Sequence, residues 1–440
     1  MIIRATSTAA PTAGTPPVAD TATVSGAGDT LTPKAVLYSG NGSTVLGSSI
    51  ASARHLKGMT DGTLQRAFSI LAENNQSGTN MDCRTRHDTA TVVQATLGAS
   101  GAINGEAFLN SLVAGGSRID WADLLNAAYL ITRINFFGDD VQAKCVEFAG
   151  DAGVNNQKDT DSLGFQPDML IFQSHFSAYA ADTDSADARI AIGVAVWNRA
   201  GTIQQFGMSA RDTDRSVLFA GAAQIHDNRV VVNVGSVTDG ASLEVTGRTS
   251  DVAKITTRDA SASVSTAILA LSFGGRRDLY AGVLPTTDPG GGAPWLDTSS
   301  TGVKAITVGI DPLAYTMIGT LLTSKNSTNR TVGQRGHWSH GWWTGFEEVC
   351  TSWRSGDNAG TPTPQSTTTS NTLAKVASVI DASGGTDWEA NHDSVSPSGP
   401  SINVTTASAA ARQVGLCVIG AVDAHWPKRK RPWLFQRARM

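Results

Sequence analysis

The protein is 440 residues long, 40% hydrophobic and only 16% charged, with a formal net charge of −4. That charge gives no electrostatic case for nucleic-acid binding, and no stretch reaches the roughly 18 apolar residues of a membrane helix. Because ordinary globular proteins are roughly 25% charged, the polar surface must be built from Ser, Thr, Asn, Gln and Gly, which favours an all-β, turn-rich protein.

The N-terminal residues predict an arm. Residues 1–20 are rich in Ala, Thr and Pro, and we expect them to be extended and ordered only against a neighbouring molecule. The first residues lack the apolar core of a signal peptide, so synthesis in a cytoplasm, without export by that route, is expected.

A short strand after a proline then recurs along the chain. It opens at Pro33, Pro167 and Pro312, in the segments 31–40, 163–172 and 309–318. An apolar run ending in glycine follows after 105, 107 and 108 residues, at Gly138, Gly274 and Gly420. Two further sets of landmarks keep the same spacing: Gly58, Gly193 and Gly336, and Ile119, Ile255 and Ile402. We therefore expect three tandem repeats, each long enough to be a domain with its own core.

The repeat sets the expected domains. We predict β-sandwich repeats over 21–150, 151–290 and 291–426, the third divergent, with polar linkers at 150–161 and 288–294. About eight short strands separated by turns in the second repeat favour a sandwich or jelly roll. Residues 62–71 could form a helix or a strand, and comparison with the second repeat favours a strand. Residues 121–130 look helical by local propensity, but comparison between the copies predicts a loop leading to the closing strand 129–137 in place of a helix.

The densest aromatic and histidine cluster is His337-Trp338-Ser339-His340-Gly341-Trp342-Trp343. Trp338, Trp342 and Trp343 could stack on a sugar, and His337 and His340 could contact a glycan or partner beside them. The two histidines would lie on opposite faces of a strand, and no third metal ligand is evident. The alternative is that the cluster packs in a core or in a contact between domains or subunits.

No motif for catalysis or cofactor binding stands out. Acidic pairs such as Glu347-Glu348 occur, but nothing places them across a cleft, and there is no nucleophile elbow or Walker loop. The four cysteines form no CxxC pair, so we interpret them as small buried residues. We expect a non-enzymatic protein without a metal or cofactor.

The C-terminal tail, residues 427–440, is basic and aromatic. Its candidate anchor residues are Lys428, Arg429, Lys430, Arg431, Trp433 and Phe435. Such a segment could fold against an acidic or apolar groove of a partner, and the alternative is a disordered, solubilising end.

Three stretches of the second repeat carry a resemblance. These are the opening strand Gly164 to Phe172, the Gly193-Val194-Ala195 strand, and the closing strand Ala267 to Gly275. The pattern resembles β-sandwich repeats found in tandem in tailed-bacteriophage virion proteins. It is close in the second repeat, fair in the first and loose in the third.

The resemblance implies a structural part of a virus particle assembled in the host cytoplasm: a tail, baseplate or fibre component, or a capsid decoration. Its partners would be other virion proteins and copies of itself. One rival hypothesis is a carbohydrate-binding adsorption protein that recognises host surface glycans. Another is a glycan-degrading enzyme, which predicts two carboxylates about 5–10 Å apart in a cleft.

Overall fold

The computed structural model describes residues 1–46, 49–51, 53–73, 82–97, 102–151, 153–174, 184–185, 187–213, 222–234, 239–259, 265–275, 277–326, 337–354, 368–373, 375–380 and 385–421. The expected all-β class is confirmed, because these residues form strands joined by turns and loops. Within these ranges, no helix has the length and apolar character needed to cross a membrane.

The chain folds into three units, each with one large sheet and one four-stranded sheet. The large sheet of unit 1 is ordered β1 (Ile2–Ala9), β11 (Leu130–Phe137), β3 (Ala35–Asn41), β5 (Ala53–Thr60), β6 (Gln65–Glu73) and β7 (Asp82–Asp88). Its small sheet is ordered β2 (Val18–Thr23), β10 (Gly116–Asp123), β9 (Ala102–Val113) and β8 (Val93–Leu97).

Unit 2 repeats this order. Its large sheet is β12 (Gln142–Ala149), β22 (Ser265–Ser272), β14 (Met169–Ser174), β16 (Asp187–Trp197), β17 (Ile203–Thr213) and β18 (Ala222–His226). Its small sheet is β13 (Gln157–Asp159), β21 (Ala253–Asp259), β20 (Asp239–Arg248) and β19 (Val231–Val234).

Unit 3 repeats it again. Its large sheet is β23 (Arg277–Leu284), β32 (Val414–Ala421), β25 (Pro312–Gly319), β26 (His337–Trp343), β27 (Glu348–Arg354) and β28 (Thr368–Leu373). Its small sheet is β24 (Gly302–Ala305), β31 (Gly399–Thr406), β30 (Thr386–Ser396) and β29 (Ala377–Ile380). In every unit consecutive strands form antiparallel meanders, and the last strand returns between the first and third strands of the unit.

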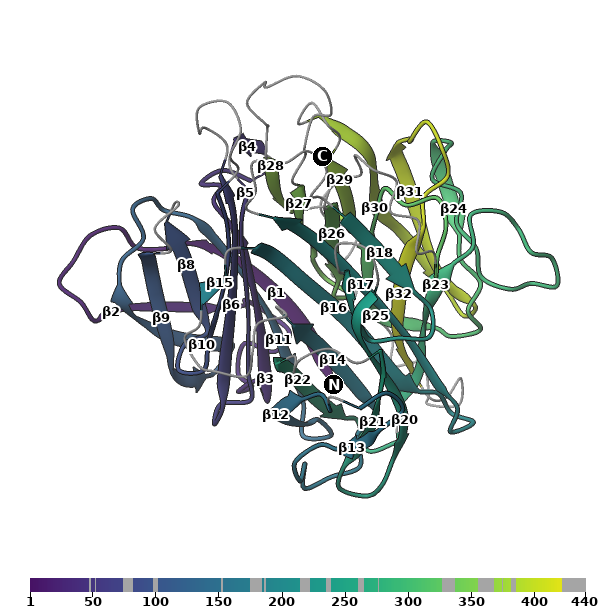
Figure 1. Cartoon of the computed structure of the whole chain (residues 1–440), viewed down its shortest axis with the longest axis horizontal. Coiled ribbons are helices and arrows are strands. Elements are labelled where there is room, and N and C mark those ends of the chain that lie inside the picture. Colours follow the sequence, from purple (N-terminus) through teal and green to yellow (C-terminus); the bar gives the residue numbers. More distant parts are fainter. Residues whose placement is uncertain are drawn as a thin grey trace.

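The opening strands are largely apolar because both of their faces are covered. In β14, Leu170 and Phe172 point into the sandwich of unit 2. Met169 and Ile171 point the other way, into a core that takes residues from the large sheets of all three units. A strand buried on both sides reads as a continuous apolar run. Figure 1 shows the large sheets meeting in the middle of the molecule, with the small sheets outside them.

Short strands and loops close the three units into a ring. β15 (Asp184–Ser185) of unit 2 pairs with β7 of unit 1, and β4 (Ser49–Ala51) of unit 1 pairs with β28 of unit 3. In unit 3, the Asn326 N–H donates to the carbonyl of Ile225, in β18 of unit 2, over 2.9 Å. Units 2 and 1 thus each add a short strand to the sheet of the unit that precedes them around the ring, and unit 3 contacts the sheet edge of unit 2.

A second set of contacts covers the opposite edge of each large sheet. The first strand of every unit donates a backbone N–H to a side chain from the hairpin of the preceding unit. The donors and acceptors are Ala5 to Glu347 Oε2 at 3.0 Å, Cys145 to Asp61 Oδ2 at 2.8 Å and Ala281 to Gln204 Oε1 at 3.4 Å. Among the described residues, a neighbouring unit therefore contacts both edges of each large sheet, which restricts pairing of those edges with other chains.

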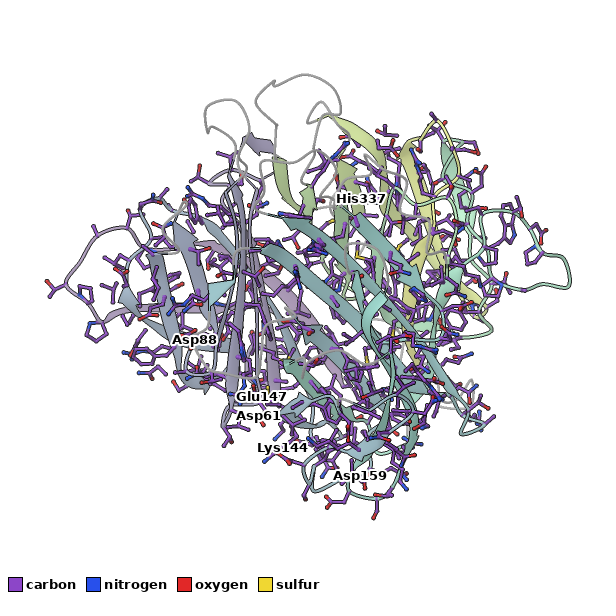
Figure 2. All side chains as sticks on the ribbon, viewed as in Figure 1. Asp61, Asp88, Lys144, Glu147, Asp159 and His337 are labelled. Atoms are coloured by element: carbon purple, nitrogen blue, oxygen red, sulfur yellow. The ribbon has the colours of Figure 1, made fainter. Side chains whose placement is uncertain are left out.

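The interface between units 1 and 2 adds an ion pair to this pattern. Arg66 of β6 lies 2.9 Å from Glu147 of β12, and both side chains are nearly buried. Figure 2 labels Glu147 and Asp61, which lie together in the lower half of the view where the two units meet. His337 lies far from them, in the upper part of unit 3.

The expected N-terminal arm is wrong. Residues 2–9 form β1, which pairs along its whole length with β11, and Ile3 and Ala5 are buried in the shared core. The arm is expected from the Ala, Thr and Pro content of residues 1–20, but the strand that opens unit 1 lies within this stretch, ahead of the first repeat landmark at Pro33.

The observed boundaries of the units also differ from the predicted ones, because each unit opens with a strand that precedes its proline landmark. Strand pairing joins β12 to β22 and β23 to β32, so the units span residues 2–137, 142–272 and 277–421 rather than 21–150, 151–290 and 291–426. The stretches predicted as linkers, 150–161 and 288–294, lie instead where the chain crosses from a large sheet to a small one. The tail 427–440 lies outside the described residues.

Strand register confirms some of the repeat landmarks and corrects others. Pro33, Pro167 and Pro312 are each four residues before structurally equivalent positions (Leu37, Ile171 and Thr316). Gly58 and Gly193 are also equivalent, but their counterpart is Gly341, and Gly336 lies outside the described residues. The expected strand at 62–71 and the non-helical 121–130 are both observed, as β6 and as the end of β10 with the loop after it.

Candidate functional site at the interface of units 1 and 3

Strand β26 divides the predicted aromatic and histidine cluster between its two faces. Trp338, His340 and Trp342 point toward unit 1, where they meet His55, Lys57 and Phe136. His337 and Trp343 lie on the opposite face of the strand. Trp343 faces the sandwich of unit 3, where its ring stacks on that of His392 with centroids 4.1 Å apart. The two histidines of the cluster therefore lie on opposite faces, as strand geometry predicted.

Four of the five cluster residues are buried. Trp338 is 0% exposed, Trp342 and His337 are each 3% exposed, and His340 is 5% exposed. A ring covered by protein cannot stack on a sugar that approaches from solvent. Trp338, His340 and Trp342 thus belong to the packing between units 1 and 3, and Trp343 packs within unit 3. This is the alternative that the sequence left open, a core or a contact between domains, and not an exposed platform.

The centre of this interface is a buried lysine. Lys57 of β5 is 3% exposed. Its Nζ lies 2.9 Å from Ser39 Oγ and 3.0 Å from Nδ1 of His340. The same Nζ lies 5.0 Å from the centroid of the Trp338 ring, which is within the range of a cation–π contact.

A chain of hydrogen bonds defines the tautomer of His340. The Thr316 hydroxyl donates to the carbonyl of Gly341 at 2.8 Å, so its oxygen is left to accept from Nε2 of His340 at 2.9 Å. With its proton on Nε2, His340 presents a lone pair on Nδ1, which accepts a hydrogen bond from Lys57. On the other side, Ser39 Oγ lies 2.8 Å from Thr351 Oγ1, which ties unit 1 to unit 3 again.

Burial controls the protonation of this group. Desolvation lowers the pKa of Lys57 to about 7, because removing an ammonium from water disfavours its charged form. Burial and the positive charge of Lys57 also hold the pKa values of His340 and His55 well below the usual range of histidine. In the described part of the chain, no carboxylate forms an ion pair with Lys57.

The repeat shows how unusual these side chains are. Register makes Lys57 of unit 1, Ile192 of unit 2 and His340 of unit 3 equivalent, each directly before the shared glycine. His55, Ile190 and Trp338 are equivalent in the same way. Lys57 and His55 were missed in the sequence, although comparing the residues before Gly58 and Gly193 would have revealed polar residues at core positions.

The remaining candidate groups have structural partners. The two residues of the acidic pair 347–348 have different partners. Glu347 forms an ion pair with Arg4 of unit 1, and Glu348 accepts a hydrogen bond from the backbone N–H of His392 at 2.8 Å. Cys145, Cys350 and Cys417 are buried free thiols. No group of three or more metal-ligating side chains occurs among the described residues.

Comparison of the chain with protein-family models, with curated proteins and with solved structures finds no match. The geometry of the molecule itself therefore carries the functional argument.

Proposed function

We propose that the protein is a non-enzymatic structural component of a bacteriophage particle that acts through protein–protein contacts. The observation that carries this proposal is the closed ring of three similar units around one continuous core. A single chain thereby has the outline of a trimer, and it suits a position in an assembly where neighbours are arranged around a threefold axis.

The two sets of ring contacts support a rigid role. Both edges of each large sheet are engaged by neighbouring units, through β15, β4 and Asn326 at one edge and through Glu347, Asp61 and Gln204 at the other. Protein assemblies need subunits that hold their shape under many weak contacts, and a core shared by three sandwiches resists hinge motion between them.

The surface composition agrees with this role. With 16% charged residues, against roughly 25% in an ordinary globular protein, the chain as a whole has fewer charges to desolvate when it packs against a neighbour. Binding of sugars through residues 337–343 is not proposed, because those side chains are covered by units 1 and 3.

The test is the protein's presence in particles. Virions purified by density gradient and washed in high salt are digested and analysed by mass spectrometry, with an abundant cytoplasmic protein of the host as the control for carry-over. The chain is expected at a fixed ratio to the major capsid protein, and a reconstruction of the particle should show a three-lobed density. Its loss from washed particles together with the cytoplasmic control would overturn the proposal.

A further inference from the structure

A small cavity lies beside Lys57 where all three units meet. Its volume is about 20 Å³, and one water-sized occupant needs about 10–15 Å³. Its polar lining comes from Ser39, Lys57 and Thr132 of unit 1, Gln173 of unit 2, and His340 and Thr351 of unit 3. The cavity therefore has room for a single water-sized or slightly larger occupant among polar groups.

Apolar side chains make up much of the lining, and its few polar groups include donors but no anionic group. Lys57 has three N–H donors, and two of them have defined acceptors in Ser39 and His340. No Asp or Glu lines the cavity. Lys57 donates a hydrogen bond to Ser39 Oγ, and the Ser39 hydroxyl can donate in turn to Thr351 Oγ1. The Thr351 hydroxyl proton is then left to point into the cavity.

Gln173 supplies a further group. It is 2% exposed, and its amide oxygen accepts no hydrogen bond from any residue that the structure describes. An amide can turn either its oxygen or its NH₂ group toward the same point. With the NH₂ turned inward, Lys57, Thr351 and Gln173 would present donors from three units to one point.

We propose that this cavity binds one monovalent anion of the halide class, such as chloride, which serves as the counter-ion of Lys57 and joins units 1 and 3 across their interface. A buried ammonium is strongly disfavoured unless it is paired, and its protein partners in the described residues are all neutral. A chloride ion is only modestly larger than water and accepts hydrogen bonds from ammonium, hydroxyl and amide donors. The inference does not depend on the proposed role in a particle.

The repeat explains why the ring would hold one anion and not three. Ile192 stands in unit 2 where unit 1 has Lys57, and Ala267 stands where unit 1 has Thr132. The titratable side chains around Lys57 are His55 on its own strand, His340 on β26 and Cys350 on β27. None of them is a carboxylate that could replace the anion.

Bromide tests the site directly. Crystals of the full chain grown in sodium bromide are expected to show an anomalous peak within hydrogen-bond distance of Lys57 Nζ. Ordered water alone at this point, with bromide only elsewhere, would overturn the proposal. This measurement uses the native protein, so it decides the question even if substitutions at Lys57 do not fold.

Thermal unfolding gives a second readout. At equal ionic strength and pH 6.5, the native protein is expected to melt several degrees higher in sodium chloride than in sodium gluconate. Lys57→Ile, which copies the residue of unit 2, should abolish this difference, whereas Lys34→Ile, which removes an exposed lysine, should preserve it. Equal melting temperatures for the native protein in the two salts, or an unchanged chloride effect in Lys57→Ile, would contradict a site at Lys57.

Discussion

A β-carbon at Gly193 would lie 1.8 Å from the carbonyl oxygen of Val230. The equivalent glycines of the other units meet the same obstacle, Gly58 at 1.9 Å from the Val92 oxygen and Gly341 at 2.1 Å from the Val376 oxygen. In each unit the large and small sheets thus approach most closely at one point, where only glycine fits. Repetition of the contact in three divergent units indicates that it sets the spacing of the sandwich.

Substitution of this glycine is expected to be severe. Gly193→Ala should lower the free energy of unfolding by at least about 2–3 kcal/mol, because the sheets must separate or the backbone must shift. Denaturant titration followed by tryptophan fluorescence measures the loss. Gly247→Ala is the matched control, since its β-carbon would meet only Lys254 side-chain atoms at 3.5 Å or more, and equal stability of the two variants would contradict the packing argument.

The buried lysine predicts a pH dependence of stability. Lys57 has a pKa of about 7 in the folded protein, below its ordinary value of 10.5. Between these values the unfolded chain binds a proton that the folded chain does not, so the free energy of unfolding rises with pH. The slope contributed by Lys57 approaches about 1.4 kcal/mol per pH unit.

The measurement compares native protein and Lys57→Ile between pH 7 and 8.5 in a halide-free buffer. This window lies below the range in which tyrosines titrate in the unfolded chain, and above pH 6.5, where the unfolded chain protonates its histidines. The thiols begin to titrate in the unfolded chain near its upper end, but both proteins contain the same thiols, so their contribution cancels in the comparison. The native protein should gain stability across it and the variant should not. Parallel curves would mean that Lys57 does not titrate inside the folded protein.

The contact between Glu347 and β1 predicts a local effect on the ring. Glu347 accepts hydrogen bonds from the Ala5 N–H at 3.0 Å and from Arg4 Nε at 2.6 Å. Glu347→Ala should cost about 1–3 kcal/mol and expose the Ala5 amide to faster hydrogen exchange. Glu244→Ala breaks ion pairs inside unit 2 and is the control, because it should leave exchange at Ala5 unchanged.

The three buried thiols predict slow chemical modification. Burial raises the pKa of Cys145 to about 12 and that of Cys350 to about 11, and it raises the pKa of Cys417 as well. The thiolate is the reactive form, so alkylation of these residues should require unfolding. Mass spectrometry of labelled peptides tests this, with denatured protein as the positive control, and labelling of Cys145 faster than global unfolding would show that the interface of units 1 and 2 opens by itself.

Composition predicted the all-β class, and comparison between copies predicted the three-part organisation. The opening prolines and two of the three glycines mark equivalent backbone positions, because proline and close-packed glycine are constrained by backbone geometry itself. The closing glycines are less informative. Gly138, Gly274 and Gly420 lie two, three and one residues beyond the equivalent positions Phe136, Leu271 and Ile419, since turns tolerate such shifts.

The ring and its polar centre were harder to predict. Nothing local distinguishes a strand buried by its own small sheet from one also buried by another unit, so Lys57 and His340, 283 residues apart, gave no sign of meeting. The tryptophans of β26 were identified as a cluster, but exposure depends on which surface covers them. Sequence comparison within the chain reveals which positions differ, and only the assembled ring reveals that two of these positions touch.

The ring imposes an order on biosynthesis. Unit 1 leaves the ribosome first, yet the partners of its His55, Lys57 and Phe136 lie in β26, and the acceptor for its Ala5 amide lies just before β27. The apolar inner face of unit 1 must therefore wait, uncovered on one side, until the C-terminal third has been translated. During this interval the nascent protein is most exposed to misassembly, either with a second copy or through premature pairing of its free edges.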